Sequence, residues 1–273
     1  TTQHTFLVSS AEVLLEVIPR AVEIAASGRP GPVLIDIPKD VQTQAIEIGA
    51  WPAPGRRLLP PPADHAAIAA AAAMINAARR PLLYLGGGVV HSGAATVAVD
   101  LAEKANLPTV MTLMALGAMP VDHPLSLGML GMHGARYCNL ALDECDLLIA
   151  VGARFDDRAT GKVTAFCPNA QIIHIDIDPA ELHKIKTAHI GITADVREAL
   201  GQLLPLVSED DRKTWGDRIA ALKTQFPFEM PDAGDPRSHF GLIRTIAACL
   251  DDEAAIATDV GQHQMWVAQA YPL

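Results

Sequence analysis

Five short apolar runs between residues 81 and 195 constrain the fold of this chain most strongly. Each run leads into glycines or polar residues, and segments with helical periodicity separate the runs. Strands that alternate with helices in this way are typical of a doubly wound, mostly parallel α/β sheet with right-handed crossovers. In chain order the runs are PLLYLGGG, LPTVMTL, CDLLIAVGARF, QIIHIDIDP and HIGITAD.

Helices are expected between these strands. Asp64 is placed to cap an alanine-rich helix that ends near Ala78, and Ser92 is placed to cap the next one. The spacing of apolar residues predicts the remaining helices at about 93–105, 134–143, 179–185 and 195–206.

Two stretches without long periodicity divide the chain into five parts. Before the first stretch, the pattern predicts a helix from Ala11 to Ser27 and a strand over 32–38, which would close an α/β layer. After the second, it predicts a helix from His239 to Leu250, then a strand, a glycine turn and a helix start in EAAIATDVGQHQMW. The expected parts are a domain tail at 1–40, a linker at 41–63, a central domain at 64–207, a second linker with a polar helix at 208–237, and a domain start at 238–273. Both ends therefore indicate a piece of a longer chain.

Composition excludes several classes of function. The 273 residues carry a formal net charge of −10 without a basic run, so a nucleic-acid partner is not expected. No uninterrupted apolar stretch is long enough to span a membrane. The four cysteines are scattered without metal-ligand spacing, which indicates buried thiols of a reducing compartment, hence a cytoplasmic protein, and no metal site in this stretch.

The residues that follow the apolar runs resemble a dinucleotide site. In open α/β sheets, ligands bind beyond the carboxyl ends of the strands. Glycines let backbone amides approach a pyrophosphate, an arginine can pair with it through two hydrogen bonds, and a carboxylate can accept from ribose or adenine. The residues at these ends are Gly86, Gly87 and Gly88; Thr112 and Leu113; Gly152, Arg154, Asp156, Asp157 and Arg158; Asp176 and Ile177; and Asp195 and Val196.

Every one of these features has a structural alternative. GGGVVH does not match GxGxxG, and the glycines could form plain turns. Asp176 and Asp195 could cap helices, and the arginines and aspartates of 154–158 could form a solvated charge cluster. The crowded stretch LGMLGMHGARYCN could be a tight turn with methionines that fill the core, or a backbone that passes close to a flat ligand. No catalytic triad, HExxH or P-loop signature occurs, which favours binding over catalysis.

Longer strings resemble one enzyme family. SGRPGPVLIDIPKDVQ, LGMLGMHG, GARFDDRATGK, HIDIDPAEL and DVGQHQMW, in this order, are similar to the catalytic large subunit of acetohydroxyacid synthase, also called acetolactate synthase. The similar strings cover residues 28–40 and 86–266, which is most of the chain.

The resemblance implies a thiamin-diphosphate-dependent enzyme with three α/β domains. Such an enzyme condenses pyruvate with a second 2-ketoacid in the first common step of branched-chain amino acid biosynthesis. The middle, Rossmann-like domain binds a structural FAD, and the third domain binds thiamin diphosphate and Mg²⁺. The large subunits form homodimers or tetramers and associate with a small regulatory subunit. The activating glutamate and the Mg²⁺ ligands would lie outside these 273 residues, so the chain should bind FAD without turnover.

The resemblance also assigns roles to individual residues. A lysine in IPKD and three residues of the central domain match the substrate channel: Lys39, Met132, Asp157 and Arg158. Gly261, Gln262 and His263 match residues near thiamin diphosphate. The residues that match the FAD site are Gly86, Gly87, Gly88, Thr112, Leu113, Leu130, Gly131, Met132, His133, Gly152, Arg154, Asp156, Arg158, Asp176, Ile177, Asp195, Val196, Gln264 and Met265. Ala159 departs from the valine frequent in the family.

Two other interpretations stay open at this point. The first is a related thiamin enzyme, such as glyoxylate carboligase or pyruvate oxidase. The second is a stand-alone dinucleotide-binding module without catalysis.

Overall fold

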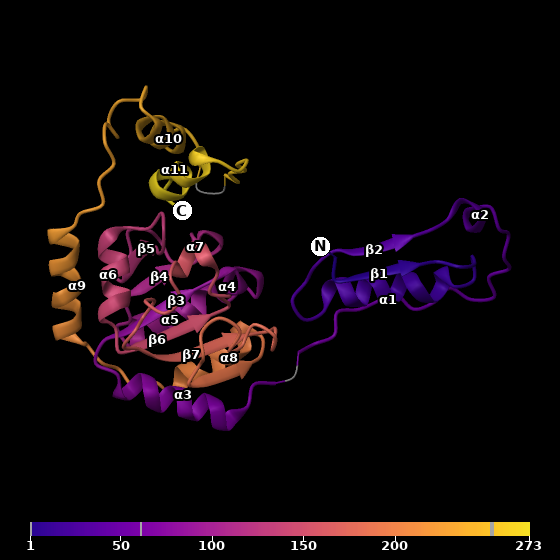
Figure 1. Cartoon of the computed structure of the whole chain (residues 1–273), viewed down its shortest axis with the longest axis horizontal. Helices are drawn as coiled ribbons and strands as arrows, with labels where there is room; N and C mark the ends of the chain where they lie inside the picture. The colour runs from indigo at the N-terminus through magenta and orange to yellow at the C-terminus, as the bar shows by residue number, and fades with distance from the viewer. Residues whose placement is uncertain (1, 61, 252–253) are drawn as a thin grey trace. The chain divides into compact units, whose positions relative to one another are not determined.

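The computed structural model describes residues 2–60, 62–251 and 254–273. The chain divides into two compact units, Thr1–Pro61 and Pro62–Leu273. Figure 1 shows the helices and strands of both units. Among the described residues, none of the helices combines the length and the apolar composition needed to cross a membrane.

The larger unit is built on a six-stranded parallel sheet, which confirms the predicted doubly wound α/β fold. Its strands lie in the order β5-β4-β3-β6-β7-β8. The chain moves outward from β3 to β5, returns to the centre at β6 and moves outward on the other side. The topological switch point, where such sheets bind ligands, therefore lies between β3 and β6. The strands are β3 Pro81–Leu85, β4 Thr109–Met111, β5 Ser126–Met129, β6 Leu147–Val151, β7 Gln171–Asp176 and β8 Ile190–Thr193.

Both faces of this sheet are covered by helices (Figure 1). Alternate residues of β3 enter two separate cores: Leu83 and Leu85 one, Leu82 and Tyr84 the other, as the two-residue period of a strand requires. α3 His65–Ala77, α5 Ala95–Lys104 and α8 Val196–Leu203 contribute to the first core. α6 Arg136–Glu144 and α9 Lys213–Gln225 contribute to the second. Shorter elements are α4 Gly87–His91, η1 Leu113–Ala115, α7 Asp157–Thr160 and η2 Leu204–Leu206.

The helix starts agree with the prediction in one case and differ in another. Asp64 caps α3, since its Oδ1 accepts a hydrogen bond from Ala66 N at 3.0 Å. Ser92 does not cap α5; it closes α4 and its hydroxyl donates to the Val89 carbonyl, while α5 begins after Ala94.

The sequence-based prediction missed β5 and placed a helix wrongly at 179–185. β5 is short, and its pairing with β4 shifts register next to Gly128, whose φ is +73°. Residues 179–185 form turns instead of a helix. The Asp178 carboxylate accepts a hydrogen bond from Ala180 N, and His183 has a φ of +61°, which a right-handed helix does not allow.

The segment expected as a second linker contributes to the larger unit. α9 buries Trp215, and the indole Nε1 donates to the Pro81 carbonyl at 2.9 Å, at the start of β3. Just before α9, the buried Arg212 guanidinium donates to the carbonyls of Ile75 and Ala105, at the ends of α3 and α5. The first half of 208–237 is therefore fixed on the sheet layer.

The smaller unit holds two parallel strands, β1 His4–Leu7 and β2 Val33–Asp36, and the helices α1 Leu14–Ala26 and α2 Lys39–Gln42. α1 and β2 agree with the sequence-based prediction, although α1 begins later than Ala11, whereas β1 was not predicted. A small core of Val8, Ala11, Val17 and Val41 lies between these elements.

The last part of the chain forms α10 His239–Ala248 and α11 Gln262–Ala270, close to the expected positions. The expected strand begins at Glu253, which lies outside the described residues, and residues 254–260 form no strand. His239 stacks on Trp266 with ring centroids 4.2 Å apart, so the two helices pack together.

Candidate functional site

The predicted glycines of β3 and β6 meet at the switch point. Gly88 N donates to the Gly152 carbonyl at 3.0 Å. A Cβ atom on Gly86 would lie 2.1 Å from the Gly152 carbonyl oxygen, and one on Gly88 would lie 2.7 Å from the Gly152 Cα. These glycines are therefore required for two turns to pack backbone against backbone. Their contact with a cofactor stays a prediction.

The loop after β6 directs Arg154 outward. Ala153 and Phe155 are buried, whereas Arg154 is exposed. Phe155 has a φ of +53°, uncommon for a side chain of this size, and its ring packs edge-on against Tyr84 and His174 at centroid distances of 5.6 and 5.0 Å. The aromatic contacts hold the strained residue, so the arginine side chain between two buried neighbours projects from the sheet edge.

His174 supports the same loop from β7. Its Nε2 lies 2.8 Å from the Ala153 carbonyl oxygen, so Nε2 carries the proton and donates. Its Nδ1 is buried without a partner among the described residues. Burial lowers the pKa of His174, which outweighs the opposite effect of the hydrogen bond to Ala153. The imidazole is therefore neutral.

The three predicted carboxylates have different local roles. Asp156 accepts from Arg158 N and Ala159 N, both at 3.1 Å, and caps α7. Asp195 accepts from Arg197 N at 3.0 Å and caps α8, which is the structural alternative that the sequence left open. Asp176 is the buried last residue of β7, accepts from Asp178 N at 2.9 Å, and caps no helix.

Thr112 provides the clearest sign of a polar ligand at this edge. It follows β4, and its backbone N donates to the Leu85 carbonyl of β3 at 2.9 Å. Its Oγ1 is buried, with no hydrogen-bond partner among the described residues. An unsatisfied buried hydroxyl costs about 1–3 kcal/mol. A ligand with phosphate or hydroxyl oxygens at this edge would satisfy it.

The glycine-rich stretch that follows β5 is a turn with an outward methionine. Leu130 N donates to the Met111 carbonyl at 3.1 Å, and Gly131 has a φ of +83°. Met132 N donates to the Arg158 carbonyl at 3.0 Å, while the Met132 side chain is 62% exposed. Its sulfur lies 3.9 Å from Arg158 Nη1. The turn thus brings together two residues predicted for the substrate channel.

The other predicted residues come from several elements of the fold. Asp157 and Arg158 are neighbours in α7, and both are exposed. Lys39 belongs to the smaller unit, where it is exposed at the start of α2. Gly261, Gln262 and His263 are exposed at the start of α11, and Gln264 and Met265 in its first turn are half-buried. Leu113 is the first residue of η1, Ile177 directly follows β7, and Val196 is the first residue of α8. Gly87 faces the Cβ of Met114.

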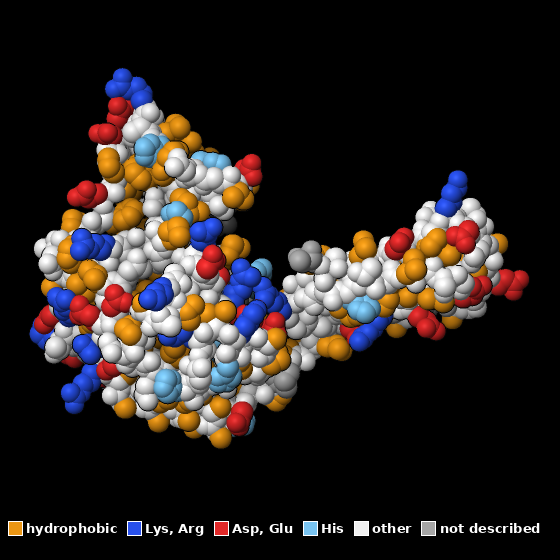
Figure 2. All heavy atoms as spheres, viewed as in Figure 1, with side chains coloured by type: hydrophobic (Ala, Val, Ile, Leu, Met, Phe, Trp, Pro, Cys, Tyr) orange, Lys and Arg blue, Asp and Glu red, His pale blue; other side chains and the backbone are white. Residues whose placement is uncertain are grey.

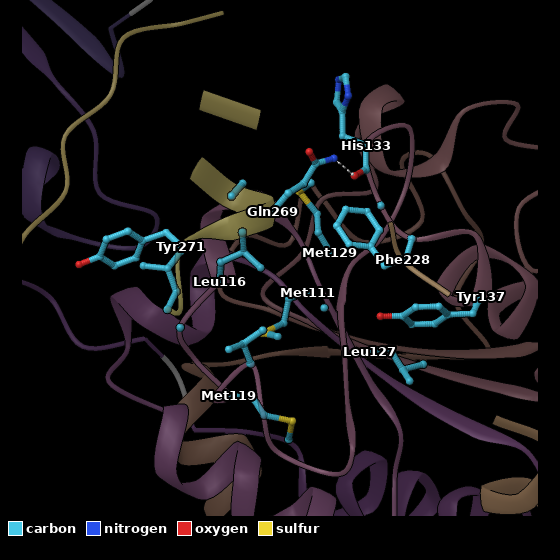
Figure 3. A pocket seen from close by; sticks show the side chains of 17 residues that line it. Met111, Leu116, Met119, Leu127, Met129, His133, Tyr137, Phe228, Gln269 and Tyr271 are labelled. Carbon is cyan, nitrogen blue, oxygen red and sulfur yellow. Dashed lines mark hydrogen bonds between the residues drawn. The ribbon is translucent and has the colours of Figure 1, made fainter. Parts of the chain in front are cut away.

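Behind the glycine-rich turn lies a mostly apolar cavity of about 100 Å³. Figure 3 shows the side chains of Met111, Leu127 and Met129 from the sheet, Tyr137 and Phe228 around it. Of the residues predicted to contact cofactors, His133 lines it. Gln269 Nε2 of α11 donates to the His133 carbonyl at 2.9 Å, which joins α11 to the turn. Thr112 and Arg154 do not line this cavity.

Three residues at the site escaped the sequence analysis. Tyr84 packs under Phe155, His174 holds the Ala153 carbonyl, and Asn139 binds Gly131. Buried polar residues inside apolar runs were the available signal for Tyr84 and His174. Within the described ranges, no group of three or more His, Cys, Asp or Glu residues is arranged to hold a metal ion.

The fold and this edge agree with a known domain family. Residues 68–203 match the family model described as "Thiamine pyrophosphate enzyme, central domain". The six-stranded part of this chain is therefore a central domain of the thiamine pyrophosphate enzyme family.

Longer similarities extend over the whole chain. It is 59% identical over 272 residues to the acetolactate synthase isozyme 1 large subunit of Escherichia coli (strain K12), which covers 100% of this chain and 48% of that protein. It is 41% identical over 268 residues to the isozyme 2 large subunit of the same organism, covering 98% of this chain and 48% of the relative. It is 44% identical over 281 residues to acetolactate synthase 1, chloroplastic, of Oryza sativa subsp. japonica, covering 99% of this chain and 43% of that protein. The motif-based resemblance is thus confirmed, and the chain spans about half the length of these relatives.

Proposed function

We propose that this chain is the middle part of an acetolactate synthase large subunit. The observation that carries the proposal is the similarity to such subunits over 272 residues at 59% identity, combined with a central domain whose switch point is intact. The parent enzyme would decarboxylate pyruvate and join the product to a second 2-ketoacid. Thiamin diphosphate, when bound, supplies the carbanion chemistry for this reaction.

The carboxyl edge of the sheet is proposed to hold FAD in a structural role. The exposed Arg154 and the Thr112 hydroxyl, which has no hydrogen-bond partner among the described residues, support it, since both offer polar groups at this edge. Arg154 would pair with the pyrophosphate, and Asp176 or Asp195 would accept from a ribose or adenine. Met132, from the glycine-rich turn, would lie against the flat ring.

The remaining assignments complete the proposal. Gly261, Gln262 and His263 would approach thiamin diphosphate, and Gln264 and Met265 the flavin. Lys39, Met132, Asp157 and Arg158 would line the substrate channel. Mg²⁺ ligands and the activating glutamate would come from other parts of the parent enzyme, so this chain alone would not turn over. The parent would work in the cytoplasm as a homodimer or tetramer with a small regulatory subunit.

A chimera tests the proposed activity. The matching 272 residues of the Escherichia coli isozyme 1 large subunit are replaced by this chain, and the purified protein is assayed for acetolactate formation from pyruvate. We expect acetolactate formation and bound FAD. A folded chimera that binds FAD but forms no acetolactate would contradict the proposal. A parallel assay with glyoxylate tests for glyoxylate carboligase activity. A second assay, which measures the oxidation of pyruvate, tests for pyruvate oxidase activity.

A further inference from the structure

The turn that carries Met132 is bound at a single residue by a side chain from a neighbouring helix. Asn139 Oδ1 accepts a hydrogen bond from Gly131 N at 2.9 Å, and Asn139 Nδ2 donates to the Gly131 carbonyl at 2.9 Å. One amide thus satisfies the donor and the acceptor of the same residue. Asn139 is the last residue of the stretch LGMLGMHGARYCN, but the sequence analysis assigned it no role.

Gly131 is restricted on its other side as well. A Cβ atom there would lie 2.3 Å from the Arg158 carbonyl oxygen, which also accepts the hydrogen bond from Met132 N. Gly131 itself has a φ of +83°, in the region that favours glycine. The residue is therefore held between the Asn139 amide and the backbone of α7.

Asn139 is itself rigidly placed. It lies in the first turn of α6, where its N donates to the Ala135 carbonyl. Its neighbour Cys138 and Leu142 one turn later are buried in the second core. Asparagine is a poor helix former, so its place in α6 is explained better by the bonds of its side chain than by helix propensity.

We propose that Asn139 is a positioning residue for the cofactor site: it holds the Gly131–Met132 turn in the form that presents Met132 outward beside Arg158. The effect on the cofactor site rests on the proposed FAD function. The clamp, meaning the two hydrogen bonds between Asn139 and Gly131, can be measured without FAD. The Met132 backbone is held by the Arg158 carbonyl, while its side chain is 62% exposed and contacts Arg158 Nη1 through the sulfur.

The first arm of the test measures amide exchange in the 273-residue chain. Asn139→Leu removes both hydrogen bonds and keeps a side chain of similar size. We expect faster exchange for residues 130–134 and unchanged exchange in β6 and β7. Unchanged exchange at 130–134 would overturn the proposal.

A matched control is available in Asn76. Its amide also makes two bonds, accepting from Ser208 N at 2.8 Å and donating to the Leu206 carbonyl at 3.2 Å, away from the glycine-rich turn. Asn76→Leu should alter exchange near 206–208 only. Both variants are also melted without FAD, which separates a local change from general loss of stability.

The second arm measures FAD affinity by flavin fluorescence. Loss of two hydrogen bonds that order the turn should raise the dissociation constant about five- to thirty-fold for Asn139→Leu, and Asn76→Leu should leave it unchanged. Faster exchange with unaltered FAD affinity would overturn the positioning role. If the wild-type chain binds no FAD, the proposed function fails, and the exchange arm alone decides whether the clamp exists.

Asn139→Asp adds a readout that a merely structural role would not produce. The ionised carboxylate accepts from Gly131 N but repels the Gly131 carbonyl, whereas the neutral acid can accept and donate like the amide. The Gly131 carbonyl needs a donor, and only the neutral acid supplies one, so a lower pH should restore both hydrogen bonds. FAD affinity of Asn139→Asp relative to wild type should therefore improve between pH 8 and about pH 5. A ratio that does not change with pH would count against the clamp.

Discussion

At the scale of single residues, the outward position of Arg154 depends on residues that face the core. Phe155 has a positive φ, and Tyr84 packs against its ring. His174 donates a hydrogen bond to the carbonyl of Ala153, which precedes Arg154. The sequence could indicate Arg154 because it follows a strand that ends in glycine. It could not indicate His174, because a histidine inside an apolar run shows its role only when the next strand is in place.

His174 makes the stability of the larger unit depend on pH. Its pKa in the folded chain is lowered from 6.5 by burial, so below about pH 6.5 the unfolded chain binds a proton that the folded chain excludes. The free energy of unfolding should therefore fall as the pH is lowered through this region. His174→Gln can keep a donor to Ala153 without titrating, so its urea-unfolding free energy should fall less between pH 7.5 and 5.5.

The control for this measurement is His91→Gln, at an exposed position of α4. It should retain the wild-type dependence on pH. Equal slopes for wild type and His174→Gln would show that His174 is not the neutral group described above.

At the scale of elements, the switch point is formed by glycines that exclude any side chain. Gly86 has an ordinary φ of −110°, so Gly86→Ala tests the contact with Gly152 without backbone strain. The clash should lower the free energy of unfolding by about 1–3 kcal/mol. Gly201→Ala, in α8 with no atom within 4 Å of the added Cβ, should raise it by about 0.5–1 kcal/mol. Urea titration measures both, and a neutral Gly86→Ala would contradict this packing.

The helix α9 belongs energetically to the sheet that it covers. Trp215→Ala removes a buried ring and the hydrogen bond to Pro81, and should cost about 3–5 kcal/mol. The exposed Trp51 of the smaller unit provides the control, since Trp51→Ala should change stability by less than about 0.5 kcal/mol. Urea unfolding followed by circular dichroism measures the free energy of unfolding of both variants. Similar stability of both variants would mean that α9 is only a linker.

The elements that the sequence predicted well are those with strong, long patterns. All five predicted strands of the central domain are present, and four of them, β3, β4, β6 and β7, follow from apolar runs that are buried on both faces. β5 escaped because its bulge and its glycine hide the period of a strand. The helix wrongly expected at 179–185 has helical spacing, but the Asp178 turn and the positive φ of His183 override it.

At the scale of the whole molecule, the chain carries both signs of charge on its surface, as Figure 2 shows for one face. The central domain has the strand order of a dinucleotide-binding fold, and the similarity to acetolactate synthase large subunits runs through all parts of the chain. The sequence motifs therefore predicted the family and the fold. They could not predict which glycines serve packing, because that depends on the register of β3 against β6.

The most direct test of the account is an FAD titration of the purified 273-residue chain, followed by flavin fluorescence, with Arg154→Ala beside it. We expect saturable binding by wild type, and affinity reduced at least about ten-fold by Arg154→Ala through the loss of a charged hydrogen bond. Arg218→Ala, which breaks the ion pair with Glu144 on the outer helices, should bind like wild type. A folded, monodisperse chain that binds no FAD, or that binds it equally well without Arg154, would contradict the proposed site.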